Sequence, residues 1–373
     1  MKLTLSILSL MLSTSLLMSQ MTLTQTIEHD GLSRSYNIYI PSAYEVADQK
    51  FPLLFCFHGF TSSADVIMAY SDFNTLAEEK EFIVVYPQGT LVSGLTHWNV
   101  GGFTAGSTVD DVGFVEALLE ALMATYQLDE QRIYSTGMSN GGYMSFLLAC
   151  QLSDKIAAIA SVTGAMTLET FDNCNPQRPM PVLQIHGDAD DVVAYEGLAF
   201  SKSIPEVLDY WIAHNDCQTS GIAMDLEDTN TGDGSTVSTL DFPNGRQCTS
   251  VNHFRVHGGG HTWPGAWGNR DISASNEVWN FVSQYNLNGL IGCTTSTQEA
   301  ESPISTAKVY PNPCVDFINI NSTQTKSYII YNKSGQILLS GKTNNKIDIS
   351  RLEPGLYFLE MDNKIQKLIK VKK

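Results

Sequence analysis

The chain has 373 residues, 43% of them hydrophobic, and a formal net charge of −17 at pH 7. A chain of this size can bury the core of a full catalytic domain and still contain a second one. Its excess of acidic residues argues against nucleic acid or an anionic membrane as a partner, because binding phosphate groups needs clustered Lys and Arg side chains.

The first residues predict an export signal. Lys2 precedes an apolar run from Leu3 to Met18, which is too short and too rich in serine to span a bilayer, and the small residue Ser19 follows. We expect cleavage near Ser19, so that residues 1–19 are a signal peptide. No other stretch approaches about eighteen uninterrupted apolar residues, so we expect the mature protein to have no transmembrane segment.

An apolar run from Phe51 to Phe57 has the length of a buried strand and ends in His58, Gly59 and Phe60. We expect His58 to form hydrogen bonds within the loop that follows this strand. The same loop can direct the backbone N–H group of Phe60 towards a substrate.

The pair Asp110-Asp111 predicts the start of a helix. The apolar residues that follow it at helical spacing are Val115, Leu118, Leu119, Leu122 and Tyr126. We interpret both carboxylates as structural groups that cap the first turn and complement the helix dipole.

Residues 137–142 read Gly-Met-Ser-Asn-Gly-Gly, between a strand-like run at 132–136 and a helix-like stretch at 143–150. A serine on a tight strand-to-helix turn with small neighbours is the nucleophile elbow of an α/β-hydrolase. Ser139 is therefore the predicted nucleophile. We expect the N–H groups of Asn140 and Phe60 to form the oxyanion hole. Because so short a motif also arises by chance, the surrounding strands and loops must support it.

The catalytic acid is predicted in the loop after a strand that begins near Pro181. This strand runs into His186, Gly187, Asp188, Ala189 and Asp190. Asp190 is our candidate, with Asp188 and Asp191 as alternatives, and we expect His186 to be bonded within the loop.

The catalytic base is predicted after the strand-like run 254–256, where His257 is followed by three glycines and His261. The glycines give His261 the freedom that a base needs, whereas His257 still belongs to the strand. The order Ser139, Asp190, His261 is the order that this fold uses.

We expect neither a metal nor another cofactor. The run His186-x-Asp188-x-Asp190 has two kinds of metal ligand, but no second ligand cluster at metal spacing accompanies it. Residues 228–234 are similar to a calcium loop without its distal Glu and its fifth-position ligand, so a hairpin turn is the better interpretation.

The tryptophans fall into two groups. Trp98 and Trp263, together with Trp267, lie in loops beside the motifs, where they are expected to stack on a sugar or phenolic group of the substrate, or to pack the His261 loop. Trp211 and Trp279 lie on helix-like stretches and are expected in the core.

An exported chain with seven cysteines is expected to contain disulfides. The suspected pairs are Cys217–Cys248, flanking a hairpin-like segment, and Cys150–Cys174. Cys56 lies within an apolar strand and is expected to be a buried thiol. Two further cysteines, Cys293 and Cys314, could pair or stay free.

Charge divides the chain into two units. Residues 301–373 hold 11 of the 22 Lys and Arg residues but 6 of the 39 Asp and Glu residues. Between the units, residues 292–304 are small and polar, as in a linker. We expect an esterase domain at 20–291 with a doubly wound, mostly parallel α/β sheet, and a small β-sandwich at 305–373, where short β-rich runs alternate with turns.

The motifs together resemble a known family. They are His58-Gly59, Trp98-Asn99, Val109–Phe114, the 137–142 elbow, His186-Gly187-x-x-Asp190 and Gly258–Gly265. Over roughly residues 25–290 they are similar to secreted polyhydroxybutyrate-depolymerase-like and feruloyl-esterase-like carboxylesterases. The resemblance implies the same triad and a two-step serine esterase mechanism.

The last segment resembles the C-terminal sorting domain of the type IX secretion system. The residues that carry this are Val309–Pro313, Ser334-Gly335, Ile347–Ser350 and Leu352–Tyr357, followed by a Lys-rich strand. It implies secretion across the outer membrane, with the tail removed or used for surface attachment.

The expected substrate is a feruloyl or acetyl ester of plant polysaccharide. The alternative is a short polyhydroxyalkanoate ester. Two other functions are disfavoured. Serine peptidases on the same fold usually add a gating domain, for which we expect no room in this chain, and an adhesin that has lost its chemistry would not need every catalytic position filled.

Overall fold

The computed structural model describes residues 21–45, 49–293, 309–320, 325–332, 336–361 and 364–372. Two compact units, Met1–Thr295 and Ser296–Lys373, make up the chain. The predicted signal peptide and most of the predicted linker lie outside the described residues. Among the described helices, none combines the length and the apolar character needed to cross a membrane.

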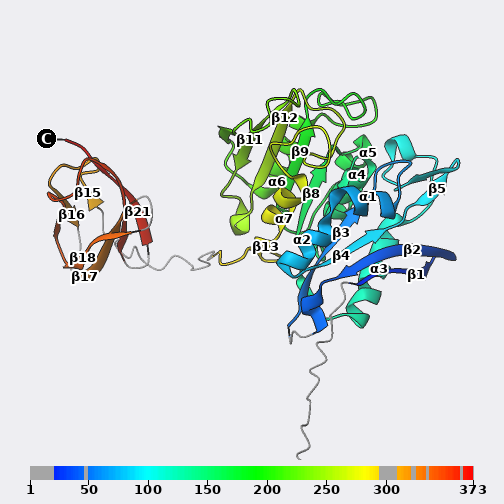
Figure 1. The fold of residues 1–373 in the computed structure, drawn as a ribbon, viewed down its shortest axis with the longest axis horizontal. Coiled ribbons are helices and arrows are strands. Elements are labelled where there is room, and N and C mark those ends of the chain that lie inside the picture. Colours follow the sequence, from blue (N-terminus) through cyan, green and yellow to red (C-terminus); the bar gives the residue numbers. More distant parts are fainter. Residues whose placement is uncertain are drawn as a thin grey trace, which may run out of the picture. The chain divides into compact units, whose positions relative to one another are not determined.

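The first unit is built on a ten-stranded sheet (Figure 1). Its order is β1 (Met21–His29), β2 (Leu32–Ile40), β4 (Ile83–Pro87), β3 (Phe51–Phe57), β7 (Leu128–Met138), β8 (Ala158–Val162), β9 (Val182–Gly187), β12 (Val251–His257), β11 (Thr236–Phe242) and β10 (Ile222–Asp225). The strands from β4 to β12 pair in parallel, and antiparallel strands continue the sheet at both edges. This confirms the predicted α/β-hydrolase fold class.

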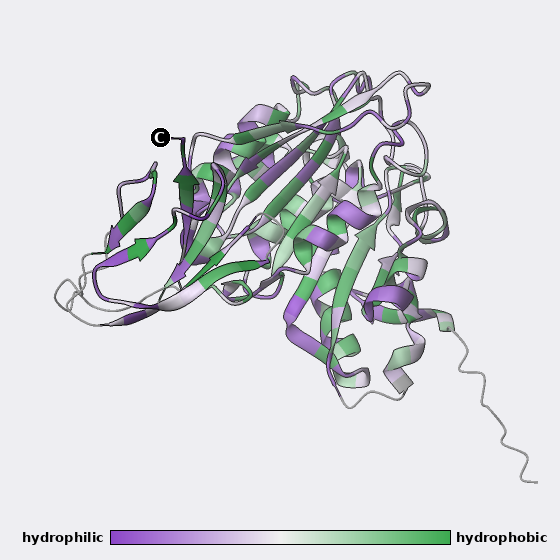
Figure 2. Cartoon of the chain, turned by 60° about the vertical axis from the view of Figure 1, so that its left-hand side comes forward, coloured by the Kyte–Doolittle hydropathy of each residue, from purple (hydrophilic) through white to green (hydrophobic). Residues whose placement is uncertain are grey.

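Helices cover both faces of the sheet. One core cluster contains buried residues of α3 (Asp111–Thr125), α4 (Asn140–Gln151) and α6 (Ile204–Asn215). The other contains those of α1 (Ala64–Ser71), α2 (Phe73–Lys80) and α7 (Ala274–Val282). Successive side chains of β3 alternate between the two clusters, which is why this strand is apolar throughout. Figure 2 shows helices carrying both green and purple residues, as expected of helices with one buried face.

Short elements complete the unit. They are η1 (Ser42–Glu45), η2 (Gly102–Thr104), η3 (Arg246–Cys248), α5 (Leu168–Asn173), the hairpin β5 (Thr90–Val92) to β6 (Leu95–His97), and the hairpin β13 (Tyr285–Asn286) to β14 (Gly289–Leu290). Residues 228–234 join the antiparallel strands β10 and β11, as the hairpin interpretation predicts.

The two carboxylates at the start of α3 have different roles. Asp110 caps the helix, because its Oδ1 accepts the N–H of Gly113 at 2.8 Å. Asp111 does not act as a cap: it is 2% exposed, and its Oδ1 lies 2.6 Å from Nη2 of Arg34. The prediction that both carboxylates cap the helix is therefore wrong for Asp111, which is the buried partner of an arginine from β2.

Of the two suspected disulfides, one is confirmed. Cys150 and Cys174 are bonded, joining α4 to the end of α5. Cys248 bonds Cys293 instead of Cys217, because β14 packs against η3 and carries Cys293 to it. Cys217 is a buried thiol whose Sγ lies 3.8 Å from the carbonyl oxygen of Thr249.

Two further cysteines are also buried thiols. Cys56 is free, as predicted, and burial raises its pKa. Cys314, in the second unit, is free as well.

The second unit contains two antiparallel sheets. They are β15 (Val309–Tyr310), β16 (Phe317–Ile320) and β19 (Lys346–Asp348), and β18 (Ile337–Thr343), β17 (Lys326–Tyr331), β20 (Gly355–Met361) and β21 (Lys364–Lys370). Residues of both sheets, such as Ile318 and Leu359, share one small core. This agrees with the predicted small β-sandwich.

Candidate active site

Ser139 lies between the end of β7 and the start of α4, in the strand–turn–helix context predicted for it. Its backbone has φ +55° and ψ −120°, which is a strained conformation for a residue with a side chain. Two hydrogen bonds hold it there: its N–H donates to Val162 O at 2.9 Å, and its carbonyl accepts the N–H of Tyr143 at 3.0 Å. The strain turns the serine out of the sheet, as a nucleophile elbow requires.

The glycine two residues after Ser139 allows the elbow to pack closely. A Cβ atom on Gly141 would lie 2.1 Å from the carbonyl oxygen of Phe57, well inside van der Waals contact. The first turn of α4 therefore presses directly on the end of β3. This explains the small residue in the G-x-S-x-G pattern at that position.

The loop after β3 runs beside the serine. A Cβ atom on Gly59 would lie 3.5 Å from Cβ of Ser139. Phe60 follows in this loop, and Asn140 is the first residue of α4, whose first N–H groups have no acceptor within the helix. The structure thus brings the segments of both predicted oxyanion donors to Ser139, and their role as donors stays a prediction.

Asp190 and His261 form a short hydrogen bond. Oδ2 of Asp190 lies 2.8 Å from Nδ1 of His261, and the aspartate side chain is fully buried while the histidine is 16% exposed. The other oxygen of Asp190 accepts the N–H groups of Val192 and Val193 at 2.9 and 2.8 Å. Burial raises the pKa of Asp190. The hydrogen bond from His261, the positive charge of that residue and the Val193 N–H outweigh burial and hold the pKa of Asp190 below its ordinary value.

This bond fixes the imidazole tautomer. An ionised Asp190 accepts a hydrogen bond from a protonated Nδ1, so Nε2 of His261 carries the lone pair that a base needs. The loops that carry the two residues are also joined, since Ala189 N–H donates to Gly259 O at 3.0 Å. Because β7, β9 and β12 are parallel, the residues that follow their carboxyl ends lie along the same edge of the sheet.

The alternative candidates, Asp188 and His257, form a hydrogen bond with each other. Oδ2 of Asp188 lies 3.1 Å from Nδ1 of His257 and 3.0 Å from Nε of Arg255. Nε2 of His257 is within 2.8 Å of the hydroxyl of Ser238, so both ring nitrogens are engaged.

The two strand-end histidines are bonded as predicted. Nε2 of His58 accepts the N–H of Gly89 at 2.9 Å, and burial lowers the pKa of His58 to about 4. Nε2 of His186 lies 2.8 Å from the carbonyl of Val193, so it donates to that oxygen.

The prediction that Trp98 and Trp263 stack on substrate is wrong. Their side chains are 0% and 1% exposed, which leaves no ring face for a ligand. Trp263 packs near Tyr70 and Phe73 and donates its indole N–H to Ser275 Oγ, in line with the alternative that it packs the His261 loop. Trp211 and Trp279 are buried, as expected.

Sequence reasoning missed an aromatic cluster beside the oxyanion loop. Phe103, which is 36% exposed, lies 6.0 Å from the ring of Phe60, 5.2 Å from Phe200 and 5.4 Å from Tyr143. Phe103 lies in the short helix η2 and Phe200 in a loop, and neither belongs to a motif, so only the fold reveals that they meet.

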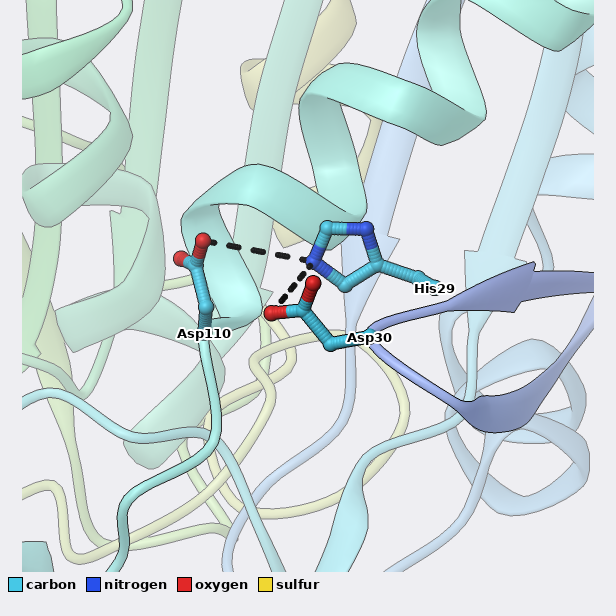
Figure 3. Close-up of side chains that lie close together, drawn as sticks. All are labelled: His29, Asp30 and Asp110. Atoms are coloured by element: carbon cyan, nitrogen blue, oxygen red, sulfur yellow. Dashed lines mark ion pairs between the residues drawn. The ribbon is translucent and has the colours of Figure 1, made fainter.

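One group of potential metal ligands converges among the described residues. Nε2 of His29 lies 3.7 Å from Oδ2 of Asp30 and 3.9 Å from Oδ2 of Asp110 (Figure 3). The aspartates are 70% and 56% exposed, and the group contains no triad residue. Its contacts tie the turn of the β1–β2 hairpin to the start of α3.

Comparison with known families gives two matches. Residues 34–214 match the esterase PHB depolymerase family, and residues 308–372 match the secretion system C-terminal sorting domain. These matches confirm both resemblances drawn from the motifs.

Similar proteins are named as esterases. The chain is 27% identical over 268 residues to a bifunctional acetylxylan esterase/xylanase, XynS20E, of Neocallimastix patriciarum, covering 71% of this chain and 35% of that protein. It is 27% identical over 277 residues to feruloyl esterase D of Neurospora crassa, covering 70% and 86%. The solved acetyl xylan esterase from Aspergillus awamori superposes with a TM-score of 0.51 at 15% identity, over 70% of this chain and 98% of that one, and shares the fold.

The fold and the elbow define an α/β-hydrolase. Its family match and its relatives support a carboxylic ester hydrolase joined to a secretion sorting domain.

Proposed function

We propose that this protein is an exported serine esterase whose triad is Ser139, His261 and Asp190. The observation that carries the proposal is the 2.8 Å bond between buried Asp190 and His261, at the sheet edge where the strained Ser139 turn ends β7. A hydroxyl group is a weak nucleophile until a base takes its proton, and this arrangement supplies an oriented base.

The reaction proceeds in two steps. Nε2 of His261 takes the proton of Ser139 Oγ as that oxygen attacks the ester carbonyl, and the N–H groups of Phe60 and Asn140 hold the oxyanion. His261 then protonates the leaving alcohol, which leaves an acyl-serine. Water, deprotonated by His261, releases the acid and restores Ser139. Asp190 stabilises the imidazolium in both steps. The proposed reaction needs no cofactor.

The proposed substrates are feruloyl or acetyl esters of plant polysaccharide. The names of the relatives support this class, and the Phe60, Phe103 and Phe200 cluster supplies an apolar surface next to the oxyanion loop for an aromatic acyl group. The family match favours a second candidate, short polyhydroxyalkanoate esters. Methyl ferulate, acetylated xylan and a hydroxybutyrate oligomer, assayed side by side, separate these possibilities.

Ser139→Ala tests the proposal. It should abolish ester hydrolysis and covalent labelling by a fluorophosphonate, without lowering the melting temperature, because the alanine removes only the nucleophilic oxygen. Ser220→Ala changes an exposed serine and should retain both activities. Labelling that persists in Ser139→Ala would assign the nucleophile to another residue.

The second unit is proposed to direct passage through the type IX secretion machinery, with residues 1–19 as the signal for the first export step. A chain that ends at Thr295 should hydrolyse soluble esters with unchanged kcat, because the proposed triad and the first unit's core lie before that residue. In a native secreting host the same chain should fail to leave the cell. Loss of kcat on truncation would show that the tail shapes the active site.

A further inference from the structure

Trp98 contacts both segments that carry the proposed oxyanion donors. Its backbone N–H donates to Oδ1 of Asn140 at 2.7 Å, and its carbonyl accepts Nδ2 of Asn140 at 3.1 Å. Its indole N–H donates to the carbonyl of His58 at 3.0 Å, two residues before Phe60. One residue therefore holds the first turn of α4 and the loop after β3 at the same time.

From these contacts we propose that Trp98 is a positioning residue that sets the spacing between the N–H groups of Phe60 and Asn140. The inference rests on the proposed function, because it concerns the oxyanion hole of that reaction. Trp98 itself is fully buried and touches no substrate.

The side chain of Asn140 serves this purpose and no other visible one. Both of its polar atoms are used by the backbone of Trp98, so it acts as a two-point clamp at the start of α4, and it is fully buried. The clamp fixes the rotation of the first helical turn, and with it the direction of the Asn140 N–H. Oxyanion donors must lie about 2.7–3.1 Å from the developing charge, so small rotations of this turn change how well the charge is held.

The clamp is itself anchored from outside the site. The N–H of Asn99, the next residue, donates to Oδ2 of Asp111 at 2.7 Å, and Asp111 is the buried ion-pair partner of Arg34. The Trp98 ring packs edge-on against Phe57, with centroids 5.0 Å apart. The segment that bridges the two donors is thus fixed by α3, whose Asp111 is held in turn by Arg34 of β2, and by the end of β3.

The contacts of Trp98 with Asn140 and with His58 form a brace between the two donors. Two variants loosen this brace without removing either N–H donor. Asn140→Ala deletes the clamp, and Trp98→Phe deletes the indole N–H while retaining an aromatic ring. Trp211→Phe is the matched control: Trp211 is also 0% exposed, and among the described residues its indole nitrogen has no hydrogen-bond partner.

Each variant is assayed on p-nitrophenyl acetate and on its thionoester, well below its melting temperature. We expect kcat to fall about 10- to 100-fold for Asn140→Ala and about tenfold for Trp98→Phe, less than the roughly 10²- to 10³-fold loss when an oxyanion donor is deleted. KM should change little, since the donors act chiefly on the transition state. The preference for the ester over the thionoester should shrink, because sulfur accepts hydrogen bonds poorly and gains little from aligned donors. Trp211→Phe should retain both values.

Three results would overturn or redirect the inference. A kcat within twofold of wild type in folded Asn140→Ala refutes the brace, and Asn140→Ala decides the matter even if Trp98→Phe is unstable. An equal fall for ester and thionoester would show a general loss of structure instead of altered donor alignment. If wild-type protein shows no ester hydrolysis that depends on Ser139, the proposed function fails, and the brace fails with it.

Discussion

The pairs Asp190–His261 and Asp188–His257 both lie at the ends of strands β9 and β12, yet their surroundings differ. Asp188 is 20% and His257 is 41% exposed, whereas Asp190 is fully buried and His261 is 16% exposed. Asp188 also bonds Arg255 and the N–H of Gly258. Asp188 therefore shares its charge between two side chains, His257 and Arg255, and one backbone N–H. Asp190 accepts two backbone N–H groups, and among the described residues its one side-chain hydrogen bond is to His261.

The difference indicates what separates the proposed catalytic pair from the other one. Burial raises the pKa of both aspartates, but their partners outweigh it and leave both pKa values below the ordinary range, so ionisation alone does not separate them. Burial of the pair and a free ring nitrogen do. The ring nitrogens of His257 are both occupied, whereas His261 bonds Asp190 through Nδ1 and can offer Nε2 to the serine.

The largest expected effect comes from replacing the histidines. His261→Ala should lower kcat about 10³-fold or more, because the serine then has no base, whereas His257→Ala should cost at most about tenfold. Steady-state kinetics on p-nitrophenyl acetate measure both. The opposite ranking would move the base to His257 and make the Asp188 pair catalytic.

Replacing the aspartates should give a smaller contrast. Asp190→Asn should lower kcat by about 10²- to 10³-fold, since an amide cannot hold the Nδ1–H tautomer or stabilise the imidazolium. Asp188→Asn should change kcat less than about tenfold, because Asp188 fixes the end of β12 and not the base. Chelation by EDTA serves as the control and should change neither value. Comparable losses in the two variants would refute the distinction between the pairs.

Local motifs predicted the geometry of the candidate site because they constrain the backbone locally. A serine between small residues at a strand-to-helix junction has few backbone conformations available, and Ser139 adopts one of them. The parallel strands then bring the loops after β9 and β12 together, so the order of the motifs was enough to place Asp190 and His261 side by side.

What the sequence did not reveal depends on packing between distant segments. Cys248 bonds a cysteine 45 residues away because β14 packs on η3, which no motif marks. Asp111 pairs with Arg34, 77 residues away, and not with its own helix. Trp98 and Trp263 were misjudged for the same reason: a loop position predicts exposure, but both rings fill space beneath their loops.

The smallest expected effect concerns buried histidines and pH. Burial lowers the pKa of His58 and of His253 to about 4, from an ordinary 6.5. Each stays neutral in the folded protein, and the unfolded chain binds the protons first as pH falls. The contribution of these histidines to the free energy of unfolding should therefore be fully present above pH 6.5. It should fall as the pH drops from 6.5 to 4, by at most about 1.4 kcal/mol per pH unit for each histidine.

The aspartate pairs do not interfere in this window, because a carboxylate with a lowered pKa loses its contribution only below its ordinary pKa of 3.8. Urea unfolding followed by tryptophan fluorescence reports the first unit, since all five tryptophans lie there. His253→Gln should remove one histidine's share of the slope, because Gln does not titrate, although it loses the bonds to Gln184 O and the Tyr195 hydroxyl and is less stable at every pH. An unchanged slope in that variant would mean that His253 is charged in the folded protein and that its burial is compensated.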